Sequence, residues 1–331
     1  MRRIFTIAIL FFFVLNTSAQ QNNNFTIAFG SCNRQNLPQP LWDIIGADKP
    51  NLWIWLGDNI YGDTDDMTIM KGKYDLQLSN EGYKKFIANT KVIGTWDDHD
   101  FGRNDAGIGY PYKKESQQLA LDFFNVSKES PLRKIEGLYS ANIFKVGSKT
   151  VKVILLDGRY HRDTLLKDGD KKYIQNTTGD ILGNVQWKWL EKELKSKADA
   201  YIIGSGIQIL SSEHPYEKWA NFPAARKRLL DLLVKTKVKG AILLSGDRHI
   251  GEFSKMDVKG LKFPLYEVTS SGLTHSATNN TNEKNQYRVG PLVNQKHYGL
   301  LNFSNNGDNL SVKIQLKGPE TQIYHTEEIT F

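Results

Sequence analysis

The chain has 331 residues, of which 40% are hydrophobic and 24% charged, and its formal net charge is +7. This length can bury a large core and no change in composition marks a linker, so a single domain is predicted for residues 20–331. The basic excess would attract an anionic substrate, but Lys and Arg form no clustered tract that would indicate nucleic-acid binding.

Residues 1–19 have the layout of a signal peptide. A basic start at residues 1–3 precedes an apolar stretch at residues 4–15 and small residues at 17–19. The apolar stretch is too short to span a bilayer, so cleavage after Ala19 is predicted; a buried first strand is the alternative. No second long apolar run follows, and no cysteine lies near the cleavage point. The sequence therefore predicts a secreted or periplasmic protein without a transmembrane segment or a lipid anchor.

Predicted strands and helices alternate through most of the chain. Short apolar runs predict strands at 25–29, 51–56, 91–96, 151–156, 200–203 and 241–244. Helical patterns occur at 66–88, at 115–124, from 183 onward, and at 226–233 behind Pro223. From residue 265 the pattern is mostly β, ending with 310–316 and 323–331.

Two β-rich halves with interspersed helices predict an α/β fold, specifically a four-layer α/β/β/α sandwich of the metallophosphoesterase type. A purely parallel, doubly wound sheet is the alternative. The late, hairpin-like strands favour the sandwich.

Side chains that can bind a metal follow four of the predicted strands. They are Cys32 after the first strand, Asp58 and Tyr61 after the second, Asp98 and His99 after the third, and Asp247 and His249 after the strand at 241–244. Open α/β folds place their sites at the carboxyl ends of strands. One such strand end often marks only a turn, but four in one domain are hard to explain by turn chemistry or core packing. The pattern therefore predicts a metal centre.

The types of ligand divide into two sets. Cys32, Tyr61 and His249 are soft or strongly donating and suit a trivalent iron. Asp98 and Asp247 are hard oxygen donors that suit Ca²⁺, Mg²⁺ or Mn²⁺, and Asp58 could bridge two ions. Each residue also has a simpler explanation: Asp98 could cap a turn, His249 could be a hydrogen-bonded core histidine, and the single cysteine of an exported chain could be buried and inert.

These motifs resemble those of the PhoD-like alkaline phosphatases and phosphodiesterases. That family belongs to the calcineurin-like metallophosphoesterase superfamily and is related to the purple acid phosphatases. The resemblance is carried by Gly30-Ser31-Cys32, Gly57-Asp58-Asn59-Ile60-Tyr61, Trp96-Asp97-Asp98-His99-Asp100 and Gly246-Asp247-Arg248-His249. It continues through residues 155–163, 186–190 and 269–273 and covers nearly all of the predicted domain, although Gly158 stands where many relatives carry threonine.

The resemblance implies a role for each matching residue. Four of them, Cys32, Asp58, Tyr61 and His249, would hold a ferric ion. Asp58, Asp98 and Asp247 would hold a second metal, for which the resemblance suggests Ca²⁺, with Mn²⁺, Mg²⁺ or Zn²⁺ as alternatives. His99 would contact the phosphoryl group. Arg103 and Asn104, in the same loop, are candidates for phosphate contact.

The predicted function is that of an exported metal-dependent phosphatase that hydrolyses phosphomonoesters, phosphodiesters or both. A hydroxide activated at a dinuclear site would be the nucleophile, and His99 would stabilise the phosphoryl oxygens or protonate the leaving group. The alternatives are a phospholipase D-like or nuclease-like phosphodiesterase, and a non-catalytic exported protein that binds metal or phosphate. The sequence does not decide whether Arg159, Arg248 or His275 contacts the substrate.

Overall fold

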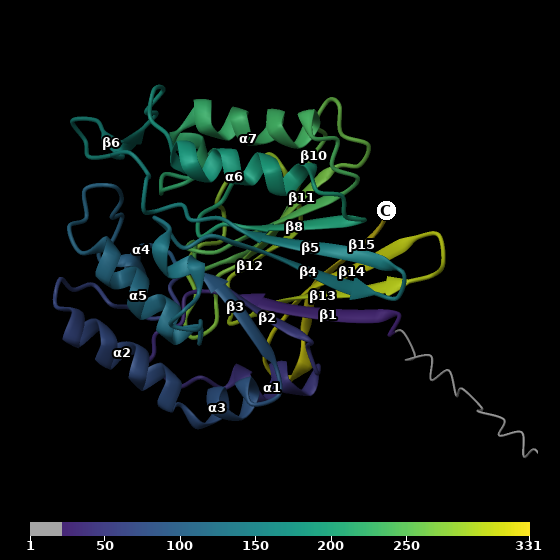
Figure 1. Ribbon diagram of the computed structural model, residues 1–331, viewed down its shortest axis with the longest axis horizontal. Coiled ribbons are helices and arrows are strands. Elements are labelled where there is room, and N and C mark those ends of the chain that lie inside the picture. The colour runs from purple at the N-terminus through teal and green to yellow at the C-terminus, as the bar shows by residue number, and fades with distance from the viewer. Residues whose placement is uncertain (1–21) are drawn as a thin grey trace, which may run out of the picture.

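A computed structural model describes residues 22–331 as two β-sheets packed face to face, with helices on both outer faces (Figure 1). The predicted signal peptide, residues 1–19, lies outside the described residues. Of the helices described in residues 22–331, none combines the length and apolar character that a membrane span requires.

The first sheet has six strands in the order β15-β14-β13-β1-β2-β3. The strands β1, β2 and β3 are parallel, whereas β13, β14 and β15 run antiparallel to their neighbours. Their bounds are β1 (Asn24–Gly30), β2 (Leu52–Leu56), β3 (Lys91–Thr95), β13 (Tyr298–Asn305), β14 (Leu310–Lys317) and β15 (Ile323–Thr330).

The second sheet has seven strands in the order β12-β10-β11-β9-β8-β5-β4. Its centre, β11-β9-β8-β5, is parallel, and β4, β10 and β12 are antiparallel to their neighbours. The bounds are β4 (Ser140–Val146), β5 (Lys149–Leu155), β8 (Ala200–Gly204), β9 (Ala241–Ser245), β10 (Gly251–Met256), β11 (Leu265–Ser270) and β12 (Arg288–Val293). Two short strands, β6 (Leu166–Lys167) and β7 (Tyr173–Ile174), pair separately.

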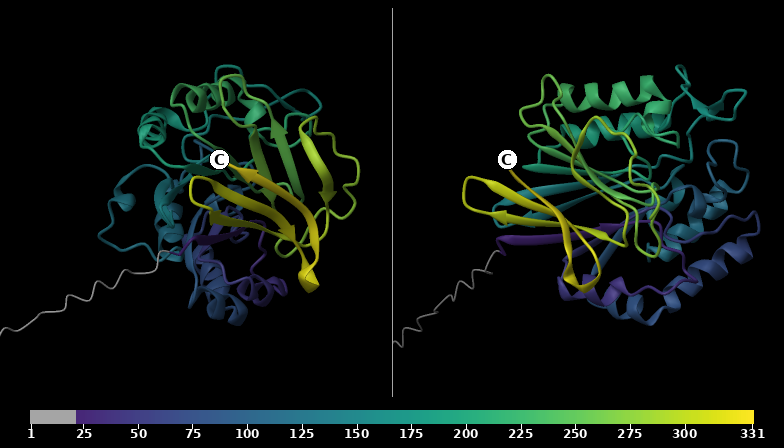
Figure 2. Two further views of the ribbon diagram at one scale, coloured as in Figure 1. Left: turned by 90° about the vertical axis from the view of Figure 1, so that its right-hand side faces the viewer. Right: turned by 180° about the vertical axis from the view of Figure 1, so that it is seen from behind.

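Helices cover the outer face of each sheet, as Figures 1 and 2 show from three sides. On the first sheet lie α1 (Leu41–Ala47), α2 (Met67–Ser79), α3 (Glu81–Ile87), α4 (Asp98–Phe101) and α5 (Lys113–Phe123). On the second sheet lie α6 (Gly183–Lys195) and α7 (Pro223–Lys235). Single 3₁₀ turns occur at Pro131–Lys134, Trp219–Asn221 and Pro319–Thr321. The predicted four-layer sandwich is therefore confirmed, and the purely parallel alternative is wrong.

The sequence of β2 shows how a strand buried on both faces builds these layers. Successive side chains point to opposite faces of a sheet. Leu52, Ile54 and Leu56 therefore join the core between the two sheets, and Trp53 and Trp55 join the aromatic core beneath the helices. Because neither face meets water, the strand is a continuous apolar run, and its polar chemistry begins only where it ends.

The helical segment predicted at 66–88 consists of two helices with a break between them. The Asp66 carboxylate accepts from the backbone N–H groups of Thr68 and Ile69 and begins α2. Asn80 ends α2 with an extended backbone, and its side chain accepts from the N–H of Tyr83 to begin α3. Asp and Asn are both favoured at N-caps, which explains why the second helix begins at Asn80.

Gly57 allows the first sheet to turn sharply at the end of β2. Its φ is +92°, and a Cβ there would lie 2.3 Å from the Cβ of Asp97 and 2.6 Å from its backbone N. We expect Gly57→Ala to lower the free energy of unfolding by about 2–4 kcal/mol, through backbone strain and overpacking against Asp97. Urea denaturation followed by circular dichroism would measure it.

Gly72→Ala is the matched control. Gly72 lies inside α2, and a Cβ there would meet nothing within 4 Å. The same substitution should therefore stabilise the protein by about 0.5–1 kcal/mol, because alanine favours the helix. Equal effects at the two glycines would contradict the role given to Gly57.

Candidate metal centre

The candidate ligands predicted from four strand ends come together where the two sheets meet. The first three strand ends belong to neighbouring strands of one sheet, and β9 belongs to the other. The Cys32 Sγ lies 3.5 Å from an oxygen of Asp58, and the Tyr61 hydroxyl lies 3.0 Å from His249 Nε2. The site is thus assembled from both sheets.

Within the described residues, potential ligand atoms form overlapping groups whose members all lie within 4.8 Å of one another. One group contains Cys32, Asp58 and His249, and a second contains Asp58, Asp98 and His99. A third group is Asp97, Asp98 and Asp247, and a fourth is Asp98, Asp105 and Glu217. Asp58 and Asp98 each belong to more than one group, which is the arrangement that shared ligands of neighbouring ions require.

Several of these residues have left-handed backbone conformations. The φ angles are 59° at Cys32, 49° at Asp58, 69° at Asp247 and 56° at His249. Residues other than glycine adopt such angles at a cost of about 1–3 kcal/mol each, and they concentrate at functional sites. Four strained residues at three strand ends therefore mark the centre independently of side-chain chemistry.

Acidic side chains are buried at this site, where a carboxylate needs a cation or a hydrogen-bond donor as a partner. Asp58 is 1% exposed, and its Oδ1 has no hydrogen-bond partner among residues 22–331. Burial and the neighbouring carboxylates of Asp98 and Asp97 raise the pKa of Asp58 well above its usual range. Burial likewise raises the pKa of Asp247 to about 7 and that of the Cys32 thiol. Bound cations would satisfy these groups, so the donors fit metal ions.

Asp100 supports the centre without facing it. Its carboxylate accepts hydrogen bonds from the backbone N–H groups of Asp58 (3.1 Å), Asn59 (3.3 Å) and Asp97 (2.7 Å). These bonds tie the loop after β2 to the loop after β3. Of the three aspartates at 97, 98 and 100, the structure therefore assigns Asp100 to positioning the backbone.

His99 is held beside the centre by a carboxylate that the sequence did not single out. Its Nδ1 lies 2.7 Å from Asp63 Oδ1, and its ring packs against that of Tyr61 with centroids 4.2 Å apart. Burial lowers the pKa of His99, but the hydrogen bond with Asp63 and the charges of Asp98 and Asp63 outweigh it, so the net shift is upward. The protonated ring is thereby favoured.

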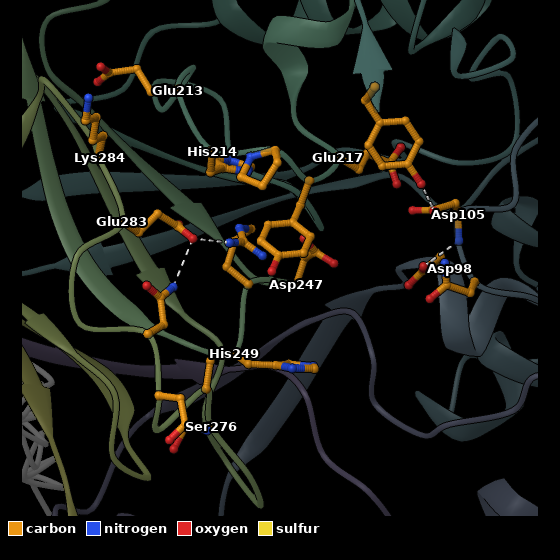
Figure 3. A pocket seen from close by; sticks show the side chains of 18 of the residues that line it. Asp98, Asp105, Glu213, His214, Glu217, Asp247, His249, Ser276, Glu283 and Lys284 are labelled. Carbon is orange, nitrogen blue, oxygen red and sulfur yellow. Dashed lines mark hydrogen bonds and ion pairs between the residues drawn. The ribbon is translucent and has the colours of Figure 1, made fainter. Parts of the chain in front are cut away.

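A cavity of about 880 Å³ opens beside the centre. Asp98, His99, Asn104, Asp247 and His249 line it. In Figure 3, Asp98, Asp105 and Glu217 lie across the cavity from His249, Ser276 and Glu283. A phosphate ester bound against the centre would therefore have room for its alcohol portion.

The two predicted phosphate contacts, Arg103 and Asn104, occupy different places. Asn104 lines the cavity next to the centre. The side chain of Arg103 is 60% exposed and forms an ion pair with Asp65. Arg103 lines a neighbouring depression with Arg162 and Tyr173 instead.

His275 is brought to the centre from the loop after β11. Its Nε2 lies 3.0 Å from the Tyr61 hydroxyl and 3.2 Å from His249 Nε2. Burial lowers the pKa of His249 to about 4 and that of His275 to about 3. The sequence offered only a weak signal for His275, its place after a predicted strand.

Arg159 is a buried ion-pair partner. Its guanidinium is fully buried and donates to Asp97 at 2.7 Å and to Glu217 at 2.5 Å. Arg248 donates to Glu283 at 2.6 Å and packs over the ring of Tyr216. Both guanidiniums therefore have carboxylate partners within the protein.

The sequence profile of the PhoD-like phosphatase family matches residues 27–322. The chain belongs to this family. Membership in the PhoD-like phosphatases, together with the fold, identifies the chain as a phosphoesterase hydrolase and confirms the resemblance found in its motifs. No protein among curated sequences matches the chain.

Solved structures show the same fold as this PhoD-like chain. A structure of PhoD has a TM-score of 0.73 and 18% identity, covering 93% of this chain and 70% of that one. GAP50 of Plasmodium, described as the anchor in the inner membrane complex, has a TM-score of 0.60 and 13% identity, with coverages of 94% and 90%. A dimetal phosphatase from Danio rerio has a TM-score of 0.55 and 13% identity, with coverages of 92% and 98%.

The burial of Arg159 leads to a stability prediction. We expect Arg159→Met to lower the free energy of unfolding by about 3–5 kcal/mol, because Asp97 would remain buried without the guanidinium that faces it. Arg103→Met is the matched control: this arginine is 60% exposed, and its surface ion pair contributes about 0–1 kcal/mol. Urea unfolding of both variants would measure the difference, and an Arg159 variant as stable as wild type would refute it.

Proposed function

We propose that the chain is an exported, metal-dependent phosphatase that hydrolyses phosphomonoesters, phosphodiesters or both at a dinuclear site. The observation that carries the proposal is the convergence of four strand ends on overlapping groups of buried and partly buried ligands, two of which share Asp58. Phosphate-ester hydrolysis by the PhoD-like family supports the reaction class. Export rests on the signal-peptide layout of residues 1–19.

Two metal sites with different donors are part of the proposal. Cys32, Asp58, Tyr61 and His249 would hold Fe³⁺, and Asp58, Asp98 and Asp247 would hold Ca²⁺, with Mn²⁺, Mg²⁺ or Zn²⁺ as alternatives for the second ion. The thiol, phenol and imidazole of the first set lie next to the all-carboxylate second set, which supports two different ions. When bound, such a pair lowers the pKa of a water and offsets the charge of the phosphoryl oxygens.

The protein's own groups would orient the ester and handle its protons. The Asp63 carboxylate fixes the ring of His99 and raises its pKa. The protonated ring would donate to a phosphoryl oxygen or to the leaving group. Asn104 offers a neutral donor on the cavity wall, whereas Arg103 is paired with Asp65 beside a neighbouring depression.

Hydrolysis of matched chromogenic esters tests the proposed reaction. We expect the purified protein to hydrolyse a nitrophenyl phosphomonoester, the corresponding diester, or both, to lose turnover on chelation, and to regain it when Ca²⁺ is restored. The diester-to-monoester ratio would place the substrate class. Elemental analysis before and after chelation establishes which metals left the protein.

Two results would contradict this reaction. Full turnover after the metals have been removed would exclude metal-dependent hydrolysis. No turnover with both metals present would favour the non-catalytic binding protein, or, if lipid or nucleic-acid diesters were cleaved instead, a specialised phosphodiesterase.

The role of His99 yields a separate prediction. His99→Ala should lower kcat by about 10²-fold or more with metal content intact, because the ring transfers or holds a proton in the reaction. His325→Ala is the matched control, since that ring is 18% exposed against 17% for His99 and likewise faces a carboxylate, Glu327. Unchanged kcat in His99→Ala would remove His99 from the reaction.

A further inference from the structure

The loop after β11 places one more metal-binding side chain against the centre than the predicted ligand set contains. His275 Nε2 lies 3.0 Å from the Tyr61 hydroxyl oxygen and 3.2 Å from His249 Nε2, and the latter two atoms are themselves 3.0 Å apart. The three atoms form a nearly equilateral triangle. Two of its corners, Tyr61 and His249, belong to the proposed iron ligands.

The hydrogen bonds of Thr274 assign the tautomer of His275. The Thr274 hydroxyl donates its single proton to the carbonyl oxygen of Cys32 at 3.2 Å. The same oxygen accepts from the backbone N–H of Arg34 at 2.8 Å and lies 3.0 Å from His275 Nδ1. While the hydroxyl proton is in the bond to Cys32, the Thr274 oxygen can only accept from Nδ1. In that arrangement Nδ1 carries the hydrogen, and Nε2 presents a lone pair to the triangle.

This tautomer excludes one simple role for His275 and points to another. A contact with a phosphoryl oxygen would require an N–H at Nε2, which the neutral ring lacks in this tautomer. A ring nitrogen whose partner nitrogen donates to a fixed acceptor is instead the usual arrangement of a metal-bound histidine. Thr274 supplies that acceptor here.

The spacing of the three atoms agrees with a shared ion. Bonds of about 2.1 Å to one metal put neighbouring ligand atoms about 3 Å apart. A cation between the three atoms would be a common partner for the Tyr61 oxygen, His249 Nε2 and His275 Nε2. A proton on Tyr61 could serve only one of the two imidazoles, and tyrosinate ligation removes that proton.

We propose that His275 is an additional ligand of the ion held by Cys32, Asp58, Tyr61 and His249, with Thr274 as the residue that fixes its tautomer. This inference rests on the proposed metal site. It gives that ion two imidazoles, one from the loop after β9 and one from the loop after β11.

X-ray absorption of the protein purified with its metals tests the inference. Elemental analysis first identifies the bound transition metal, and absorption is then recorded at the edge of that metal. The scattering from imidazole rings should indicate two histidine ligands in wild type and one in His275→Gln. A ferric ion bound to Tyr61 would give a visible charge-transfer band, and this band should shift in the same variant. The affinity for the metal should fall by about tenfold, which lowers the metal content of the purified protein.

Three further variants separate ligation from a structural effect. Thr274→Val removes the acceptor for Nδ1 and should shift the band in the same direction by a smaller amount, whereas Thr274→Ser keeps the hydroxyl and should restore wild-type values. His161→Ala, which replaces a histidine beside Glu136, should change nothing. Circular dichroism establishes that each variant is folded.

The results for the metal ligands test the role of His275 independently of whether the protein hydrolyses phosphate esters. One histidine at the metal in wild type, or an unchanged band and metal content in folded His275→Gln, overturns it even if phosphate esters are hydrolysed. Two histidines in wild type and one in His275→Gln support it even if the chromogenic esters are not cleaved. A wild-type protein without a transition metal bound to Cys32 and Tyr61 overturns it as well.

Discussion

Buried negative charge at the junction of the two sheets is the constraint on which the rest of the structure depends. Asp58, Asp97 and Asp98 are buried close together, and the partly buried Asp247 joins them at the edge of the cavity. Arg159 offsets part of this charge through Asp97. Carboxylates gathered in this way cost free energy unless cations accompany them, so the fold and the metal requirement have a common origin.

The layers of the sandwich explain how this charge is kept in place. β2 is apolar on both faces, with tryptophans packed under the helices and aliphatic side chains between the sheets. A shift of one residue would exchange its tryptophans and its aliphatic side chains between two differently packed cores, so the register, and with it the position of the residues that follow β2, is fixed. Asp100 then links the loops after β2 and β3 through backbone hydrogen bonds.

Two β-rich halves with interspersed helices made the layered fold predictable from the sequence, and residue chemistry at strand ends indicated the loops that carry the candidate ligands. Among the carboxylates at 97, 98 and 100, the strand-end pattern predicted Asp98 as a ligand and assigned no role to the other two. Only the backbone of the turn decides that Asp97 meets Arg159 and that Asp100 turns back to the loop after β2. Asp105 and Glu217 follow no strand-end motif: Asp105 is tied to Asp98 by a backbone hydrogen bond within one loop, and Glu217 meets Asp98 through tertiary packing. The sequence around Arg159 is equally compatible with a buried ion pair and with a contact to substrate. The complete burial of the Arg159 side chain distinguishes the two.

The division of the ligands between two sheets has a mechanical consequence. Tyr61 belongs to a loop of the first sheet, and His249 to a loop of the second, so an ion bound to both is a cross-link between the layers. The apolar interface between the sheets is non-directional and tolerates small displacements, whereas coordination bonds do not. The ion would thus fix the relative position of the sheets at one end of the sandwich.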